Sequence, residues 1–242
     1  VRLPQPPPAM RVDQLVLTGD DCAFDNRRFV IPTEQQDVTV VYSGLGVLDD
    51  PAQMPYFLNL TMIDSDRRRL RLHYHPVAGD EAFPIDAATG LIVLCRSLSP
   101  NQVQQLHAYA DGGGTLLFVV PDASVAATLG ALLEDPSLRL EESSGDYVML
   151  GQIDFEHPLF SRFSGARYND FTKIRFARHR RILAATTGNA DVIARFDNGD
   201  PAVLAQRRGR GRIVILASGW QPVDSQFALS TKFVPFIEGL LE

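Results

Sequence analysis

Short apolar runs alternate along the chain with segments that have helical spacing. Val38–Tyr42, Leu91–Cys95 and Thr115–Val120 are almost continuously apolar, as strands buried on both faces of a parallel sheet are. After the second run, Ser99–Gln102 supplies an N-cap serine, a first-turn proline and a third-position amide, and Gly112–Gly114 predicts where that helix ends. Strands alternating with helices indicate an α/β fold with a parallel sheet.

Two further helices are predicted from capping residues. Asp49 or Asp50, with Pro51 in the first turn, predicts a helix after the first apolar run. Asp122 predicts another helix after the run that ends at Val120. Both helices have apolar residues recurring on one face, so we expect them to pack on the sheet.

The segment Arg69–His75 alternates between apolar and polar residues, which predicts a half-exposed strand near an edge of the sheet. The two histidines are two residues apart and could supply two metal ligands. Arginines on the same face oppose a bound cation, so a solvated strand face is the preferred interpretation. Leu70, Leu72 and Tyr74 are expected to point inward, and Arg69, Arg71, His73 and His75 outward.

The second half of the chain departs from this alternation. Val192–Phe196 and Ala202–Ala205 flank Asn198-Gly199, which predicts a β-hairpin, with Pro201 limiting the pairing just after the turn. Arg212–Ala217 predicts another buried strand. We expect these strands to extend the sheet in antiparallel fashion and a last helix, with Phe233, Phe236, Ile237 and Leu240 on one face, to close the domain.

The N-terminal segment differs from the rest of the chain in its proline content and in its short β-type runs. Prolines crowd the first ten residues, which predicts an extended arm, and Val12–Thr18 and Arg27–Ile31 are two short β-type runs. We therefore divide the chain into residues 1–36, a proline-rich arm and the tail of a β-rich module, and residues 37–242, an α/β domain. The predicted fold class is α/β: a flavodoxin-like, doubly wound, mostly parallel sheet with an antiparallel extension, preceded by a short β-rich segment.

Composition narrows the functional classes. The 242 residues are 45% hydrophobic and carry a net charge of −6, so a nucleic-acid binder is disfavoured. No apolar run approaches the roughly 18 residues of a membrane span, and no signal peptide is recognisable at Val1. The two cysteines, Cys22 and Cys95, are too few for a disulfide scaffold or an all-cysteine zinc site.

The central motifs resemble class I glutamine amidotransferase-like domains. Leu91–Leu94, Leu98–Gln102 and Asp111–Leu117 look like the strand, serine-capped helix, glycine-rich turn and strand of that group. His157–Phe160 and Gly209–Val214 are similar to its later segments. These motifs are structural, so they imply the fold more strongly than any activity.

A more specific resemblance involves the N-terminal segment. Thr18–Asp21 and Phe24–Phe29, followed by this domain and by Phe233–Pro235, resemble the C-terminal part of Bat-type (aerotolerance-regulator-like) membrane proteins. The resemblance implies an extracytoplasmic (periplasmic) module, itself soluble, in a larger protein anchored to the membrane by segments outside this chain. Its partners would be other protein domains of the same parent chain or complex, and the oligomeric state is left open.

The resemblance does not extend to an amidotransferase nucleophile. Amidotransferases place a cysteine on a tight strand-to-helix elbow, and the corresponding turn here, Pro121–Ser124, has none. Cys95 is followed by Arg96 rather than by the small residues of an elbow. We therefore expect a non-catalytic binding or interaction module. The alternative is a hydrolase or sugar-modifying enzyme in which Asp122 and His157 converge at the carboxyl ends of the strands.

Ligands of doubly wound sheets bind outside the carboxyl ends of the strands. Four segments are expected to meet there, and the candidate pocket residues are Ser43, Ser97, Asp122 and His157. In the purely structural interpretation, the glycines form turns and Trp220 packs in the core. No cofactor is predicted, because Gly44 and Gly46 lack the third glycine of a dinucleotide site. No metal is predicted, because arginines share the strand face of the two histidines. The four segments are Ser43–Gly46, Arg96-Ser97, Pro121-Asp122 and Ser218–Trp220.

Two groups of arginines complete the candidates. We interpret both as solvated faces, with an acidic partner surface as the minority interpretation, because no aromatic residues are interleaved for base stacking. The groups are Arg175, Arg178, Arg180 and Arg181 with His179, and Arg207, Arg208, Arg210 and Arg212.

Overall fold

The structure, a computed structural model, describes residues 14–19, 26–29, 35–75, 80–143, 145–183 and 190–242. Within these residues, Gln14–Val16 (β1) pairs in antiparallel fashion with Arg27–Phe29 (β2). The short β-rich unit predicted near the N-terminus is therefore present. The proline-rich arm lies outside the described residues.

A mixed eight-stranded sheet organises the rest of the chain. In the spatial order given below, the first five strands run parallel and the last three continue the sheet in antiparallel fashion, which confirms the predicted fold class. The strand that begins near Arg212 was expected in the antiparallel extension, but it pairs in parallel with Thr115–Val119 and is the fifth parallel strand. In spatial order the strands are β4 (Arg68–His75), β3 (Gln36–Gly44), β5 (Thr89–Cys95), β6 (Thr115–Val119), β12 (Gly211–Leu216), β11 (Pro201–Arg208), β10 (Asp191–Phe196) and β8 (Leu150–Ile153).

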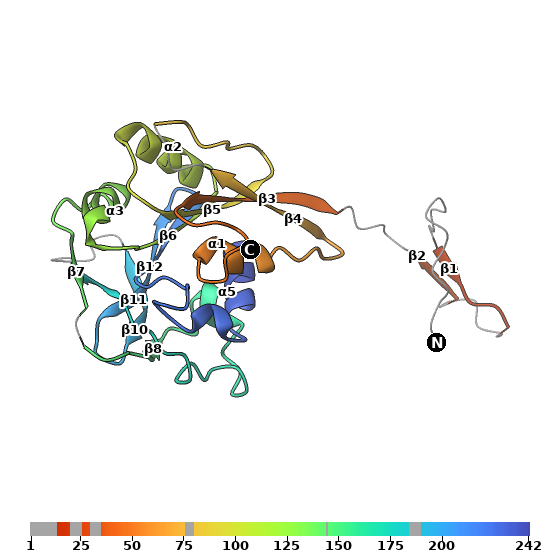
Figure 1. Cartoon of the computed structure of the whole chain (residues 1–242). Helices are drawn as coiled ribbons and strands as arrows, with labels where there is room; N and C mark the ends of the chain where they lie inside the picture. Colours follow the sequence, from red (N-terminus) through yellow and green to blue (C-terminus); the bar gives the residue numbers. More distant parts are fainter. Residues whose placement is uncertain (1–13, 20–25, 30–34, 76–79, 144, 184–189) are drawn as a thin grey trace.

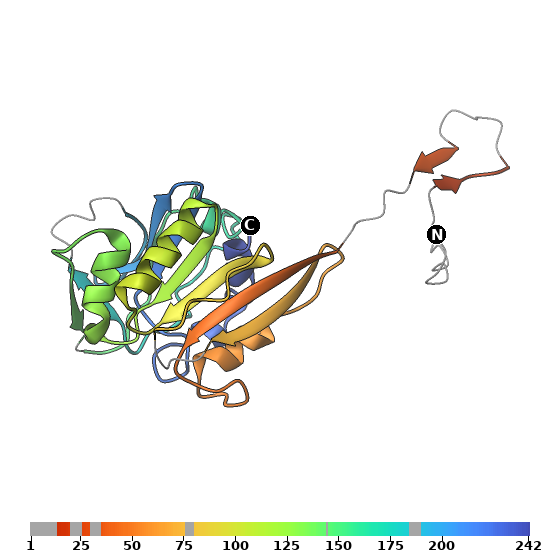
Figure 2. The same cartoon turned by 90° about the horizontal axis from the view of Figure 1, so that it is seen from above.

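Helices cover both faces of this sheet (Figures 1 and 2). On one face lie α2 (Pro100–Asp111) and α3 (Ala126–Leu133), and on the other lie α1 (Met54–Leu60) and α5 (Phe233–Leu240), with α4 (Pro158–Ser161) against α5. Short 3-10 turns occupy Ala123–Val125 (η1) and Phe227–Leu229 (η2). The sheet is thus doubly wound.

The predicted local signals of α2 and of the hairpin are confirmed. Ser99 and Gln102 form a reciprocal capping box at the start of α2. Strands β10 and β11 pair across the Asn198-Gly199 turn, where Gly199 has a φ of +90°. Pro201 is the first residue of β11, a position at which a strand tolerates proline.

The core lies on both sides of the central strands. Leu91–Leu94 and Leu116–Val119 have no exposed surface, as near-continuous apolar runs predict. Trp220 is also fully buried, and its indole N–H donates to the carbonyl of Met54 at 2.8 Å. Trp220 therefore packs in the core, as the purely structural interpretation of this residue predicted.

The start of α1 differs from the prediction. The helix begins at Met54 with Gln53 at its N-cap and a proline in its first turn. Asp50 instead accepts from the backbone N–H of Ala52 in the turn before the helix. Two prolines compete for the first-turn position here, at 51 and 55, and the structure uses Pro55.

Burial corrects two further predictions. His75 was expected on a solvated face but is 5% exposed, because Phe83 from a later loop packs its ring 4.9 Å from the imidazole. Arg180 and His179 are also buried, because each finds a carboxylate distant in sequence: Arg180 pairs with Asp224 at 2.9 Å, and His179 with Asp200 at 2.9 Å.

Candidate functional site

The order of the parallel strands fixes where a ligand site is expected. Numbered by their position along the chain, the five parallel strands follow the order 2-1-3-4-5. In flavodoxin-like sheets of this order the connections leave in opposite directions from the first and third strands, and ligands bind at the carboxyl edge between them. In this chain those strands are β3 and β5. We call the carboxyl edge between them the switch point.

Arg96 lies directly after β5 at the switch point and is held by three hydrogen bonds. Its Nε donates to Ser43 Oγ at the end of β3, at 2.7 Å. Its Nη1 donates to the carbonyl of Ser97 at 3.0 Å and to Gln102 Oε1 at 3.3 Å. Gln102 is fixed in turn by the capping box of α2. The guanidinium therefore has a defined position.

The charge of Arg96 has no counter-charge within the described residues. The side chain is 8% exposed, none of the ion pairs among those residues includes it, and its Nη2 is buried without a hydrogen-bond partner. The Phe83 ring lies 5.6 Å from the guanidinium carbon, a cation–π contact that offsets about 0.5–2 kcal/mol of the burial cost. Burial lowers the pKa of the guanidinium, yet arginine stays charged in proteins. A buried, unpaired cation costs several kcal/mol unless a counter-charge is supplied.

His75 adds a second buried polar atom on the same face of the sheet. It ends β4 and stands opposite Ser43 in the strand register. Leu94 also pairs with Ser43, and side chains alternate along a strand, so His75, Ser43 and Arg96 share one face. The Nε2 atom of His75 is buried without a partner. Burial, followed by the charge of Arg96, lowers the pKa of this imidazole.

The only cysteine within the described residues points to the opposite face. Cys95 donates to Tyr42 Oη at 3.1 Å, and the Tyr42 hydroxyl donates to the carbonyl of Leu45 at 2.8 Å. Burial raises the pKa of the Cys95 thiol to about 11. Since His75 lies across the sheet, Cys95 has no adjacent imidazole to activate it.

Cys95 is therefore expected to resist alkylation in the folded protein. A rise in pKa from 9.0 to about 11 lowers the thiolate fraction at neutral pH about 100-fold. In a Cys22→Ser background, iodoacetamide should label Cys95 at least 100-fold more slowly at pH 7.5 than in the urea-unfolded chain. Labelling at equal rates in both states would contradict this environment.

The four sequence candidates do not form one site. Ser43 and Ser97 both contact Arg96, so the structure brings these two together. Asp122 follows β6 and caps η1 by accepting from Ser124 N–H. His157 caps α4 and lines a cavity with Thr115, at the amino end of β6. Asp122 and His157 therefore lie at opposite ends of one strand and cannot act as a pair.

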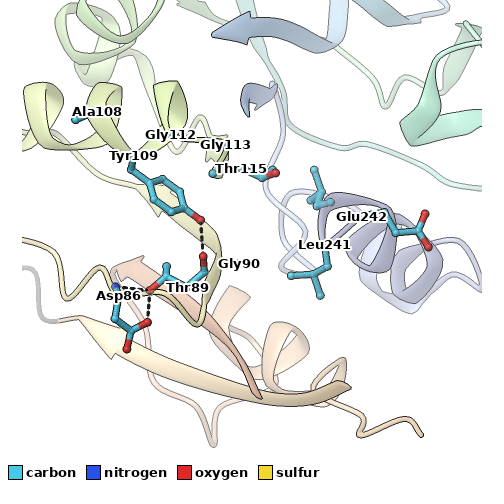
Figure 3. A pocket seen from close by; sticks show the side chains of 12 residues that line it. Asp86, Thr89, Gly90, Ala108, Tyr109, Gly112, Gly113, Thr115, Leu241 and Glu242 are labelled. Atoms are coloured by element: carbon cyan, nitrogen blue, oxygen red, sulfur yellow. Dashed lines mark hydrogen bonds between the residues drawn. The ribbon is translucent and has the colours of Figure 1, made fainter. Parts of the chain in front are cut away.

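Two cavities open at the amino ends of the parallel strands, away from the switch point. One, of about 490 Å³, is shown in Figure 3, where the Tyr109 hydroxyl donates to the carbonyl of Thr89. The other, of about 430 Å³, contains His157 and Arg212. The Arg212 guanidinium donates hydrogen bonds to Thr115 Oγ1 and to the carbonyls of Gly239 and Leu240 at the end of α5. Its donors therefore connect β12 to β6 and to α5.

Two features of the switch point escaped prediction from the sequence. Arg96 belonged to a segment expected at this edge, but nothing in the sequence showed that its charge would be buried and unpaired. The strand pattern predicted that His75 points to solvent. The pattern does not include the later loop that carries Phe83, which covers His75 in the folded protein. Alternation identifies the face to which a residue points, but it cannot tell whether that face is covered.

No protein-family model and no curated protein matches this chain, but several solved structures are similar. The cytoplasmic protein STM1381 from Salmonella typhimurium LT2 aligns with a TM-score of 0.60 at 15% identity, over 84% of this chain and 98% of that one. STM3548 from the same species gives 0.59 at 16%, over 84% and 97%. A ThuA-like protein from Parabacteroides merdae gives 0.54 at 16%, over 86% and 89%.

These similarities define the class of fold. ThuA-like proteins have a class I glutamine amidotransferase-like fold, so the fold implied by the motifs around α2 is confirmed. At such identities the likeness concerns the fold and assigns no activity.

None of the helices in the described residues has the length and apolar character needed to cross a membrane. The described part of the chain also holds no group of three or more histidine, cysteine, aspartate or glutamate residues placed to bind a metal ion.

Proposed function

We propose that this chain is a binding module that takes up a small anion at the switch point, with Arg96 as the residue that holds it. The proposal is carried by one observation: the Arg96 guanidinium is buried and held in place, and its Nη2 has no partner. An anion at Nη2 would offset the cost of burying this charge and would form a charge-assisted hydrogen bond.

The surroundings of Arg96 support binding rather than bond-breaking chemistry. The groups that contact it are a hydroxyl, an amide, a backbone carbonyl and the ring of Phe83, which position the guanidinium and supply no nucleophile or general base. The thiol of Cys95 faces the other side of the sheet with a raised pKa. The pairing of Asp122 with His157, on which the hydrolase alternative depended, is separated by the length of β6. We therefore propose a non-catalytic module.

The experiment is a titration of the purified protein with acetate, followed by NMR chemical shifts. Saturable binding with a Kd in the millimolar range is expected, since one anchored anion supplies only about 4 kcal/mol. Arg96→Met removes the charge at similar volume and should weaken binding at least tenfold. Arg139→Met is the matched control, because Arg139 is exposed and its guanidinium donates only to nearby carbonyls. No saturable binding, or equal binding by all three proteins, would refute the proposal.

The setting of the module is a further part of the proposal and is supported by the Bat-type resemblance alone. We propose that the domain belongs to a longer, membrane-anchored protein, works on its extracytoplasmic side, and binds other domains of that chain or complex. The Salmonella proteins similar in fold are described as cytoplasmic, and that description is theirs. Sequencing the complete gene tests this setting: flanking membrane spans and a von Willebrand A-type domain would support it, and their absence would refute it.

A further inference from the structure

We infer that the anion held at Arg96 is a small hydroxycarboxylate, with the carboxylate on Arg96 and the hydroxyl hydrogen-bonded to Nε2 of His75. This inference rests on the proposed function and specifies the ligand of the same site. It uses the two partnerless buried atoms, Arg96 Nη2 and His75 Nε2, which belong to side chains on one face of the sheet at its carboxyl edge.

The charge at the site favours a carboxylate over a phosphate. Two of the three guanidinium nitrogens of Arg96 are already used by Ser43, Ser97 and Gln102, which leaves Nη2 alone for a ligand. A single buried positive charge is neutralised by a monoanion. A phosphate dianion would retain an unpaired negative charge, and phosphate sites usually add a set of backbone N–H groups. The N-terminus of α2 is already capped by Ser99 and Gln102.

The second contact follows from the partnerless Nε2 atom of His75. In a neutral imidazole this nitrogen either accepts a hydrogen bond or carries the proton and donates one. In either form, a buried polar atom is stabilised by a hydrogen-bond partner. The ligand must therefore present a polar group to His75 as well as an anion to Arg96.

A hydroxyl is the polar group that fits this environment, because it can donate to Nε2 or accept from it. The neutral form of His75 is favoured by burial and by the positive charge of Arg96. An ammonium group on the ligand would bring a second positive charge into the same buried space, at a cost in desolvation and repulsion. A hydroxyl forms the hydrogen bond without adding charge. The described charged neighbour of the ring on the covering loop is Glu81, which is exposed and partly offsets the effect of Arg96.

The test compares carboxylates that differ only by a hydroxyl. Glycolate and acetate form one pair, and 3-hydroxypropionate and propionate form another that probes where the hydroxyl must lie. The wild-type protein should bind at least one hydroxylated member about five- to tenfold more tightly than its partner, the gain expected for one buried hydrogen bond. Inorganic phosphate should bind more weakly than that hydroxycarboxylate.

The variants separate this inference from the proposed function. His75→Phe, which can still stack on Phe83, and His75→Gln should both keep acetate binding; His75→Phe should lose the preference for the hydroxyl. Arg96→Met should lose both ligands. If acetate binds through Arg96 but no hydroxyl improves affinity, or if His75→Phe keeps the preference, the inference fails and the proposed function stands. Tighter binding of phosphate than of every carboxylate also refutes it. If nothing binds, both fail.

Discussion

Replacing Asp224 by alanine should lower the free energy of unfolding by about 3–5 kcal/mol, the cost of leaving one member of a buried ion pair alone. The Asp224 and Arg180 side chains are only 2% and 8% exposed, and Asp224 Oδ2 lies 2.9 Å from Arg180 Nη1. Asp224 also accepts from Gln221 Nε2 at 2.9 Å. Without this carboxylate, Arg180 keeps only Glu142, whose side chain is 54% exposed.

Urea denaturation measures this effect, and two further proteins make it specific. Arg69→Ala removes an exposed pair with Asp37 and should cost no more than about 1 kcal/mol. The double variant Arg180→Met/Asp224→Leu replaces the buried pair by apolar side chains and should recover most of the lost stability. A loss in Asp224→Ala no larger than in Arg69→Ala would show that the pair is not buried as described.

Gly44→Ala should also be strongly destabilising, with an expected loss of about 3 kcal/mol, the upper end for overpacking. A Cβ atom on residue 44 would overlap Cys95 Sγ and would lie 3.0 Å from the hydroxyl oxygen of Tyr42. The glycine is required because the Cys95 side chain fills the space that its own side chain would occupy. The substitution would therefore separate β3 from β5 at the switch point.

Removing the sulfur supplies the decisive comparison. The double variant Gly44→Ala/Cys95→Ala should be more stable in urea than Gly44→Ala alone, because the overlapping atom is gone. Gly165→Ala is the control, since the nearest atom to a Cβ there is 3.7 Å away, and it should change stability by less than about 0.5 kcal/mol. A double variant no more stable than the single one would exclude the overlap as the cause.

Most helices, turns and buried strands of the fold could be predicted from local sequence signals. The capping box of Ser99 and Gln102, and the turn at Asn198-Gly199, depend on residues only a few positions apart, so the sequence shows them completely. The buried strands were visible as apolar runs. What failed at this level was the start of α1, where neighbouring aspartates and two prolines offered more than one solution.

Features that depend on distant partners could not be predicted. Arg180 looked like one of a solvated group, but Asp224 reaches it from 44 positions along the chain. The small sheet of β7 (Arg139–Glu142) and β9 (Arg180–Leu183) joins segments too short and too polar to stand out. These elements owe their structure to tertiary contacts rather than to local preference.

The same distinction applies to the site. The topology placed Ser43, Arg96 and Ser97 at one edge, and the structure brings them into contact. The feature that makes the place a site is the unpaired charge of Arg96, and this follows from burial by residues of other segments. His75 joined the site for the same reason, through Phe83. The sequence therefore predicts where these residues lie, but their burial, which gives Arg96 and His75 their binding properties, depends on tertiary contacts.

The central claim is that Arg96 is buried as a cation that requires an external anion. Unfolding free energies of wild type and Arg96→Met, each measured without and with a saturating carboxylate, test it most directly. Without ligand, Arg96→Met should be as stable as wild type or more stable by about 1 kcal/mol, because an unpaired buried charge is removed. With ligand at 100 times the wild-type Kd, wild type should gain about 2.7 kcal/mol, and a variant that binds at least tenfold more weakly should gain no more than about 1.4 kcal/mol. A variant that is several kcal/mol less stable without ligand, and a wild type that gains nothing with it, would contradict the account.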